Sequence, residues 1–150
     1  MAYLKKSILI QAPIEQVYAL ARDPSRWATF YVGLSEPEEV IGEGEVGTTV
    51  KHTYLMAGMR FPVTTVVLED EIAPTGGRWR GKIEGPLAGE HSWSYMSKEG
   101  GTEVTVEMNY TVPGAVLGRI ADRLIIERMQ SHATAQTLEN LKLLCESSAR

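Results

Sequence analysis

The chain has very little cysteine, and it lacks the motifs that most metal sites and several hydrolase classes require. Among its 150 residues is a single cysteine, Cys145, which excludes a disulfide within the chain and is typical of a reducing compartment. Three histidines occur without an H-x-x-x-H or C-x-x-C motif, and catalytic zinc needs three protein ligands. The serine-hydrolase motif G-x-S-x-G is absent as well. We therefore predict no metal site and no cofactor.

Strong charge of one sign and long apolar runs are also missing. The chain carries 15 Lys and Arg against 19 Asp and Glu, a formal net charge of −4, and Lys5-Lys6 is its only basic pair. Because nucleic-acid binding usually depends on a basic stripe, we expect no nucleic-acid partner. No apolar run approaches the roughly eighteen residues of a membrane span, and no signal-peptide pattern is seen. These absences predict a cytoplasmic protein, monomeric or weakly dimeric, without an integral membrane segment.

What remains is the composition of one ordinary globular domain. Hydrophobic residues make up 43% of the chain and charged residues 23%. Internal repeats, low-complexity segments and a Ser/Gly-rich linker are absent. We therefore predict that residues 1–150 form a single domain, long enough to bury a sizeable core.

The first third of the chain predicts a strand followed by two short helices. Residues 3–11 alternate between apolar and polar positions, as a half-buried strand does. Pro13 and Glu15 then suit the first turn of a helix. Asp23-Pro24 ends that helix and begins a second one, which Gly33 ends in turn.

The middle of the chain predicts strands alone. Apolar residues recur with a period of two, and turns rich in Gly and Pro separate the segments. Short turns between neighbouring strands form hairpins, so the sheet is expected to be antiparallel. The predicted strands cover residues 48–56, 59–72, 78–85, 90–98 and 102–112.

The C-terminal part predicts one long helix. From Ala115 to Cys145 the chain contains no proline, and such a helix spans about 45 Å. A helix longer than any of the strands is expected to lie across the face of the sheet. The stripe expected to face the sheet contains Ile120, Leu124, Ser131, Ala135, Leu138, Leu141 and Cys145.

Three segments carry a resemblance to a known superfamily. They are the strand leading into APIEQVYALARDPSRW, the YTVPG at residues 110–114, and the QTLENLKLLCE at residues 136–146. Together they resemble the START-like, or SRPBCC, superfamily, which includes polyketide cyclase/dehydrase-like proteins. In one departure, no proline follows Trp27 closely. The resemblance implies an α+β helix-grip fold, in which a curved antiparallel sheet of about seven strands wraps around a long C-terminal helix. It also implies two short helices after the first strand, and a deep apolar pocket between sheet and helix.

Residues that face inward from the strands, and polar ones close to the helix stripe, are the candidate pocket residues. A register slip of one position would turn His52 and His91 outward instead. The large aromatic residues could be core fillers rather than ligand contacts. Arg128 could bind a carboxylate or phenolate of a ligand, or it could face solvent. The predicted ligand-binding set is His52, Tyr54, Trp79, His91, Trp93, Tyr95, Met108, Tyr110, Leu124 and Arg128.

Two functions fit such a pocket. The first is binding of a small hydrophobic molecule, such as a lipid, a polyketide-like ring or an isoprenoid. The alternative is a polyketide cyclase/aromatase or dehydratase. In that reaction His52 or His91 would be the general base, and Tyr54 or Tyr110 would polarise a carbonyl oxygen. A protein-interaction role would instead require a contiguous exposed apolar patch.

Overall fold

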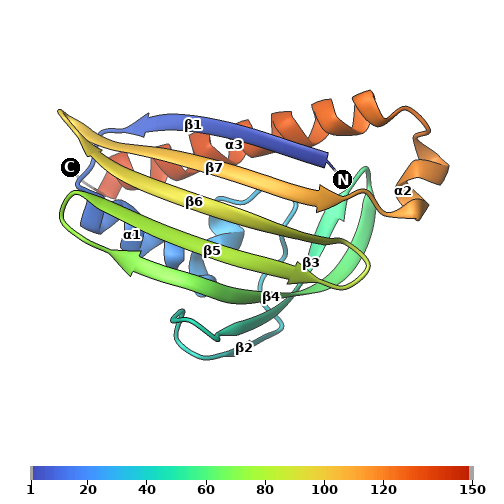
Figure 1. Cartoon of the computed structure of the whole chain (residues 1–150), viewed down its shortest axis with the longest axis horizontal. Helices are drawn as coiled ribbons and strands as arrows, with labels where there is room; N and C mark the ends of the chain where they lie inside the picture. The colour runs from blue at the N-terminus through green and yellow to red at the C-terminus, as the bar shows by residue number, and fades with distance from the viewer. Residues whose placement is uncertain (1, 149–150) are drawn as a thin grey trace.

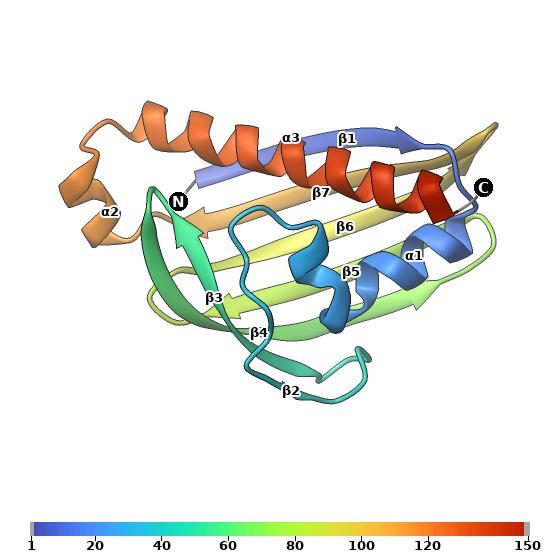
Figure 2. The ribbon, with the colours of Figure 1, turned by 180° about the vertical axis from the view of Figure 1, so that it is seen from behind.

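A curved antiparallel sheet with helices along one face makes up the structure, a computed structural model that describes residues 2–148 (Figures 1 and 2). From β2 to β7, strands that follow each other in sequence are neighbours, and β1 lies beside β7, which gives the order β1-β7-β6-β5-β4-β3-β2. The fold implied by the resemblance is therefore confirmed. The strands are β1 (Ala2–Ile10), β2 (Glu39–Ile41), β3 (Thr49–Met56), β4 (Met59–Ile72), β5 (Gly76–Glu84), β6 (Ala88–Lys98) and β7 (Gly101–Thr111).

β4 contains an irregularity that changes which of its side chains face inward. Its pairing with β5 shifts between Val67 and Glu69, as at a β-bulge. Before the shift, the alternate residues Val63, Thr65 and Val67 are buried. After it, Asp70 lies opposite the buried Trp79 of β5. The bulge thus turns a carboxylate toward the helices.

Two short helices follow β1 on the inner face of the sheet. They are α1 (Ile14–Arg22) and the 3₁₀ helix η1 (Pro24–Thr29), which Asp23 caps by accepting a hydrogen bond from the Ser25 backbone N–H. The buried Trp27 donates its indole N–H to the backbone carbonyl of Ala21 at 2.9 Å. This bond ties the two helices together.

The Asp70 carboxylate anchors α1 to β4. It accepts a hydrogen bond from the Tyr18 hydroxyl at 2.6 Å, and Arg22 donates to it from Nε at 2.9 Å and from a terminal nitrogen at 2.7 Å. Burial alone would raise the pKa of Asp70, but the bonds from Arg22 and Tyr18 outweigh that effect and hold the pKa below its ordinary value.

The C-terminal helix is interrupted once, so the predicted continuous helix from residue 115 to 145 is wrong in its first turns. The chain forms α2 (Gly114–Arg119) and α3 (Arg123–Ser148), with Ile120 between them in extended backbone (φ −126°, ψ 99°). Asp122 ends the interruption because its carboxylate accepts the Leu124 backbone N–H at 2.9 Å. α3 then runs along the inner face beside β1 and β7 (Figure 2).

The core falls into two clusters along the length of α3. The α1 end contains Trp27, Trp79, Trp93, Tyr95, Leu141 and Cys145 among others. The α2 end contains Tyr54, Phe61, Ile83, Met108, Tyr110 and Ile126 among others. The names α1 end and α2 end are kept for these clusters below.

Candidate ligand-binding site

An interior hollow lies where the two ends of the core meet. The space between its side chains admits no more than about one water molecule. None of the lining residues is an Asp, Glu, Lys or Arg. The lining residues are Trp27, Tyr31, Leu34, His52, Tyr54, Thr65, Ile83, His91 and Met108.

Strand register places both candidate histidines in this lining. His52 on β3 is 4% exposed and His91 on β6 is 6% exposed, so the slip that would turn them outward does not occur. In the sheet, β4 and β5 lie between the strands of the two histidines. The curvature of the sheet brings both side chains to one hollow. Their role as ligand contacts stays a prediction.

The two imidazoles have different hydrogen-bond partners. His52 Nε2 and the Thr65 hydroxyl lie 2.7 Å apart in a buried bond. Trp93, two residues along the same strand, donates its indole N–H to Nδ1 of His91 at 3.1 Å. In the part of the chain that the structure describes, Nε2 of His91 has no hydrogen-bond partner.

Both imidazoles are uncharged at neutral pH. Burial lowers the pKa of His52 to about 4, because the charged form loses its hydration. Burial, together with the nearby His52, lowers the pKa of His91 to about 4 as well. A neutral imidazole carries one N–H donor and one acceptor nitrogen, so each ring can offer a directed hydrogen bond without charge.

A tyrosine and a glutamine complete the polar part of the site. Gln130 on α3 is buried and donates its side-chain N–H to the Tyr54 hydroxyl at 3.2 Å. The same nitrogen lies 3.9 Å from the Met108 sulfur. Burial raises the pKa of Tyr54, so its hydroxyl stays protonated and remains available as a donor.

A second hollow adjoins the first on the side of the α2 end. It too admits no more than about one water molecule, and Tyr54, Ile83 and Met108 line both hollows. Tyr110 lines only the second one, and burial raises its pKa to about 12. A movement of the three shared side chains would join the two hollows into one.

Several residues of the predicted ligand-binding set lie elsewhere. Trp79, Trp93 and Tyr95 are buried in the α1 end and line neither hollow. Among the described residues, Trp79 Nε1 is the one buried side-chain nitrogen or oxygen without a partner. These three aromatic residues therefore pack the core behind the site.

Leu124 and Arg128 line neither hollow, so the inward position expected for them is wrong. Leu124 is 61% exposed and Arg128 is exposed, because the first half of α3 turns Ile126 and Gln130 toward the sheet instead. The expected stripe holds only in the second half of the helix. Residues that share the inward face at helical spacing are Ile126, Gln130, Thr134, Thr137, Leu138, Leu141 and Cys145.

Other lining residues were missing from the sequence-based set. Thr65 continues the inward alternation of Phe61 and Val63 on β4, so strand periodicity alone could have identified it. Tyr31 and Leu34 lie in the loop after η1, where no periodic pattern exists. Only the folded chain brings that loop over the sheet.

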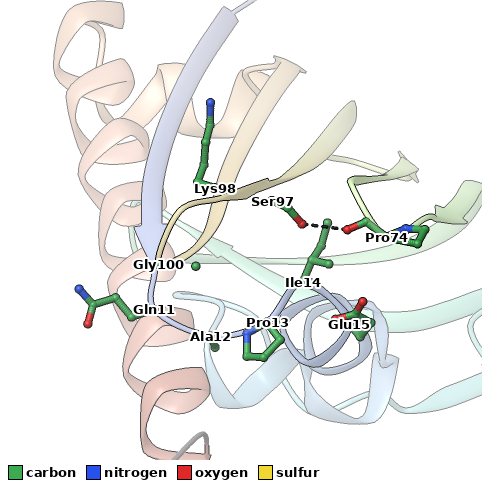
Figure 3. Close-up of a pocket in the computed structure, with 10 residues that line it drawn as sticks. Gln11, Ala12, Pro13, Ile14, Glu15, Pro74, Ser97, Lys98 and Gly100 are labelled. Atoms are coloured by element: carbon green, nitrogen blue, oxygen red, sulfur yellow. Dashed lines mark hydrogen bonds between the residues drawn. The ribbon is translucent and has the colours of Figure 1, made fainter.

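Wider hollows lie at the surface, and they differ in character from the interior one. One is a groove between the loop at residues 33–38 and β3, and Leu34 lines both this groove and the interior hollow. Another lies at the start of α1, between residues 11–15 and the β6–β7 turn (Figure 3). There the Ser97 hydroxyl donates to the Pro74 carbonyl at 2.9 Å, and Lys98 points away from the helix. The polar side chains that line this groove at the start of α1 are exposed, so none of them is held in place to bind a ligand.

The described residues contain neither a cluster of potential metal ligands nor a helix that could span a membrane. Across residues 2–148, three or more His, Cys, Asp or Glu side chains nowhere gather closely enough to hold a metal ion. Within the same residues, each helix is too short or too polar to cross a membrane.

Comparisons with known proteins agree with this architecture. The profile of the family described as "Polyketide cyclase / dehydrase and lipid transport" matches residues 1–146. A crystal structure of a Thermus thermophilus protein superposes with a TM-score of 0.82 at 18% identity, covering 99% of this chain and 100% of that one. A START superfamily protein from Mycobacterium smegmatis gives a TM-score of 0.72 at 12% identity and 97% coverage of both chains.

A longer protein shares the fold over part of its length. The di-domain ARO/CYC protein BexL of the BE-7585A biosynthetic pathway gives a TM-score of 0.70 at 15% identity, covering 97% of this chain and 50% of its own. A search of curated protein sequences found no match. At these identities the structural likeness shows the fold.

Proposed function

Because the chain belongs to the polyketide cyclase/dehydrase and lipid transport family, we propose that it binds a small, mostly apolar molecule in the interior hollow. One observation carries the proposal: two buried, uncharged imidazoles lie in an aromatic wall without a charged residue. Core packing alone favours apolar residues at such positions, because buried polar groups are costly unless they are hydrogen-bonded. A ligand with both apolar and polar parts would use this lining.

Binding requires side chains to move. The two hollows share Tyr54, Ile83 and Met108, and a methionine side chain adapts its shape more easily than other core residues. Displacing Met108 would join the hollows into one space for a ring system. Leu34, which lines both the interior hollow and the surface groove, marks the route from solvent.

The expected affinity is modest. Burying about 300 Å² of apolar ligand surface contributes about 7 kcal/mol. Association and side-chain ordering cost about 4 kcal/mol or more. The difference, about 3 kcal/mol or less, corresponds to millimolar or weaker dissociation constants unless hydrogen bonds add to it.

The cyclase or dehydratase alternative has support from one feature: His52, His91 and Tyr54 line the same hollow. In the described structure, however, the histidines bond to Thr65 and Trp93, and Gln130 bonds to the Tyr54 hydroxyl. A His–Tyr acid–base pair would therefore have to form through the substrate itself. Incubation with a poly-β-ketone mimic and product analysis tests this alternative, and wild-type rates equal to those of a His52→Phe/His91→Phe double variant would contradict it.

The binding proposal is tested with N-phenyl-1-naphthylamine, a neutral fluorescent probe. Wild-type protein should enhance its emission in a saturable way, with a dissociation constant in the millimolar range or below it where hydrogen bonds contribute. Ile83→Phe should weaken binding at least about tenfold, since the added bulk fills the wall between the hollows, while costing about 1 to 3 kcal/mol of stability. Leu143→Phe is the matched control, because Leu143 is exposed on α3. Unchanged probe affinity in a folded Ile83→Phe protein, or absence of binding to wild type, would overturn the proposal.

A further inference from the structure

We infer that Nε2–H of His91 is the donor that recognises the ligand, and that the ligand offers it an uncharged carbonyl oxygen. The inference rests on the proposed function and assigns the chemical class of the ligand: an apolar, ring-sized molecule with a neutral ketone or aldehyde group. It follows from the position of the His91 proton, from the absence of another partner and from the absence of charge around the ring.

The hydrogen bond from Trp93 determines the tautomer of His91. An indole N–H can only donate, so Nδ1 of His91, 3.1 Å away, has to be the acceptor. A neutral imidazole carries a single proton, which must then lie on Nε2. His91 therefore presents a donor, in a fixed orientation, on the side of the ring that Trp93 leaves unoccupied.

That donor has no hydrogen-bond partner within the described chain, and the residue opposite it on β5 is a glycine, over which the Trp79 ring lies. Gly81 is paired directly with His91, and a Cβ at position 81 would lie 3.3 Å from Nε2 of His91 and 2.4 Å from Cη2 of Trp79. The missing side chain allows the imidazole and the indole to lie side by side, with ring centroids 5.1 Å apart. An N–H that has no acceptor within the protein keeps its hydrogen-bonding capacity, so a bound acceptor adds a bond that the protein alone does not make.

His52 differs from His91 in this respect. Its Nε2 is already bonded to the Thr65 hydroxyl at 2.7 Å, a partner from the neighbouring strand β4. The Thr65 hydroxyl can donate or accept, so it does not determine which nitrogen of His52 carries the proton. Of the two imidazoles, His91 is therefore the one whose proton position follows from its protein partner. His52 and Thr65 form a neighbouring polar surface.

The surroundings select against charge on the ligand. The lining contains no Lys or Arg to balance a carboxylate, and no Asp or Glu to balance an ammonium group. Transfer of an unpaired ion into such a site is far more costly than transfer of a neutral polar group. A neutral carbonyl accepts the bond from His91 without that penalty.

The test compares three two-ring probes of similar size: 2-acetylnaphthalene, 2-ethylnaphthalene and 2-naphthoate. Titrations are followed by quenching of tryptophan fluorescence or by calorimetry at pH 7. The acetyl probe should bind about two- to tenfold more tightly than the ethyl probe, the range expected for one neutral hydrogen bond. The naphthoate should bind most weakly. In His91→Phe, 2-acetylnaphthalene and 2-ethylnaphthalene should bind with about equal affinity, and 2-ethylnaphthalene should still bind.

A second measurement starts from the wild-type protein, so its first result does not depend on a variant folding. In ¹⁵N-histidine spectra of the wild-type protein, His91 should show the Nε2–H tautomer, and 2-acetylnaphthalene should shift its Nε2–H proton resonance. Trp93→Phe removes the indole donor and should produce a mixture of tautomers with a smaller acetyl preference.

The outcomes separate the two proposals. Equal affinities for the acetyl and ethyl probes, or an Nδ1–H tautomer, would overturn the carbonyl inference and leave the binding site standing. If none of the three probes binds, the proposed function fails and the inference fails with it. Tightest binding of 2-naphthoate would also contradict the inference, because it would require a cationic partner in the hollow.

Discussion

The two ends of the core differ in how completely they are filled. At the α1 end, tryptophan and tyrosine rings pack edge to face, as Trp27 does on Trp79 with centroids 5.6 Å apart. At the α2 end, one hollow remains between Tyr54, Met108 and their neighbours, and another lies where this end meets the α1 end. One sheet and one helix therefore support a packed region and an incompletely packed region, side by side.

The two halves of α3 account for much of this difference. In its second half the helix turns Leu138, Leu141 and Cys145 toward the sheet. In its first half it turns Gln130 and Thr134 inward, with Ile126. Polar and smaller side chains fill less apolar volume, so space and hydrogen-bonding capacity remain where the hollows lie. A rigid end can hold the strands in place while the other end adapts to a ligand.

The largest change in stability is expected when a side chain is removed from the packed α1 end. Leu141→Ala, at a fully buried position, should lower the free energy of unfolding by about 2 to 5 kcal/mol, because it leaves a cavity that cannot collapse. Leu124→Ala on the same helix is the control, and at an exposed position it should change stability by less than about 0.5 kcal/mol. Urea unfolding followed by circular dichroism measures both. Similar losses for the two variants would mean that α3 packs differently from the description above.

The next test compares the polar anchors of the two ends. Asp70→Asn at the α1 end weakens the charged bonds from Arg22 and should cost about 2 to 3 kcal/mol. Gln130→Met at the α2 end removes a neutral bond to Tyr54 and should cost about 1 kcal/mol or less. Urea unfolding at pH 7 distinguishes them, and a larger loss for Gln130→Met would reverse the assignment of the rigid end.

The Asp70 anchor also predicts acid sensitivity. The pKa of Asp70 is held below its ordinary value of 3.8 in the folded protein, so the unfolded chain takes up the proton first as the pH falls. Its contribution is therefore complete well above pH 3.8 and is lost as the pH falls through the folded pKa. Asp70→Asn should reduce the steepness of stability loss below about pH 4, a region in which Gln130→Met should follow wild type.

A further pH test concerns the hollow itself. Both histidines have a folded pKa of about 4 against an ordinary value of 6.5, so between these values the unfolded state binds more protons. Stability should therefore fall as the pH is lowered from about 6.5 to 4, by up to about 1.4 kcal/mol per pH unit for each histidine. His91→Phe should remove one such contribution, measured by urea unfolding at pH 7 and pH 5. An unchanged dependence would mean that His91 is not buried in its neutral form.

Strand residues of the site could be predicted from the sequence, and helix and loop residues could not. Alternation with period two survives folding, so His52, His91 and Met108 were identified with the correct face. On α3, apolar residues occur on several faces of its first half, and periodicity alone could not choose Ile126 over Leu124. The correct choice depends on how the helix begins after its interruption.

The hollow as a whole was beyond sequence reasoning for a different reason. The loop residues Tyr31 and Leu34 meet the sheet through a bridge between Leu34 and Tyr54, a contact between segments twenty residues apart with no local pattern. The resemblance to a superfamily implied a deep pocket, whereas the side chains leave only small separate hollows. Volume between side chains depends on rotamers, which alternation and spacing do not determine.

The smallest expected effect concerns how easily each end opens, and it needs no change in overall stability. Cys145 is fully buried at the α1 end, and burial, with nearby Glu146, raises the pKa of its thiol to about 11, so reaction with a disulfide reagent at pH 8 should be slow. Met108→Cys in a Cys145→Ala background places a thiol at the hollow.

If the α2 end opens locally at a free energy lower by about 1.4 kcal/mol, the thiol at 108 reacts about tenfold faster than Cys145 in wild type. A bound apolar probe should then slow the thiol at 108 and leave Cys145 unaffected, because only the hollow end has to move to admit it. Equal rates at both positions, or equal protection by the probe, would mean that the two ends open together and that the difference in packing has no consequence for binding.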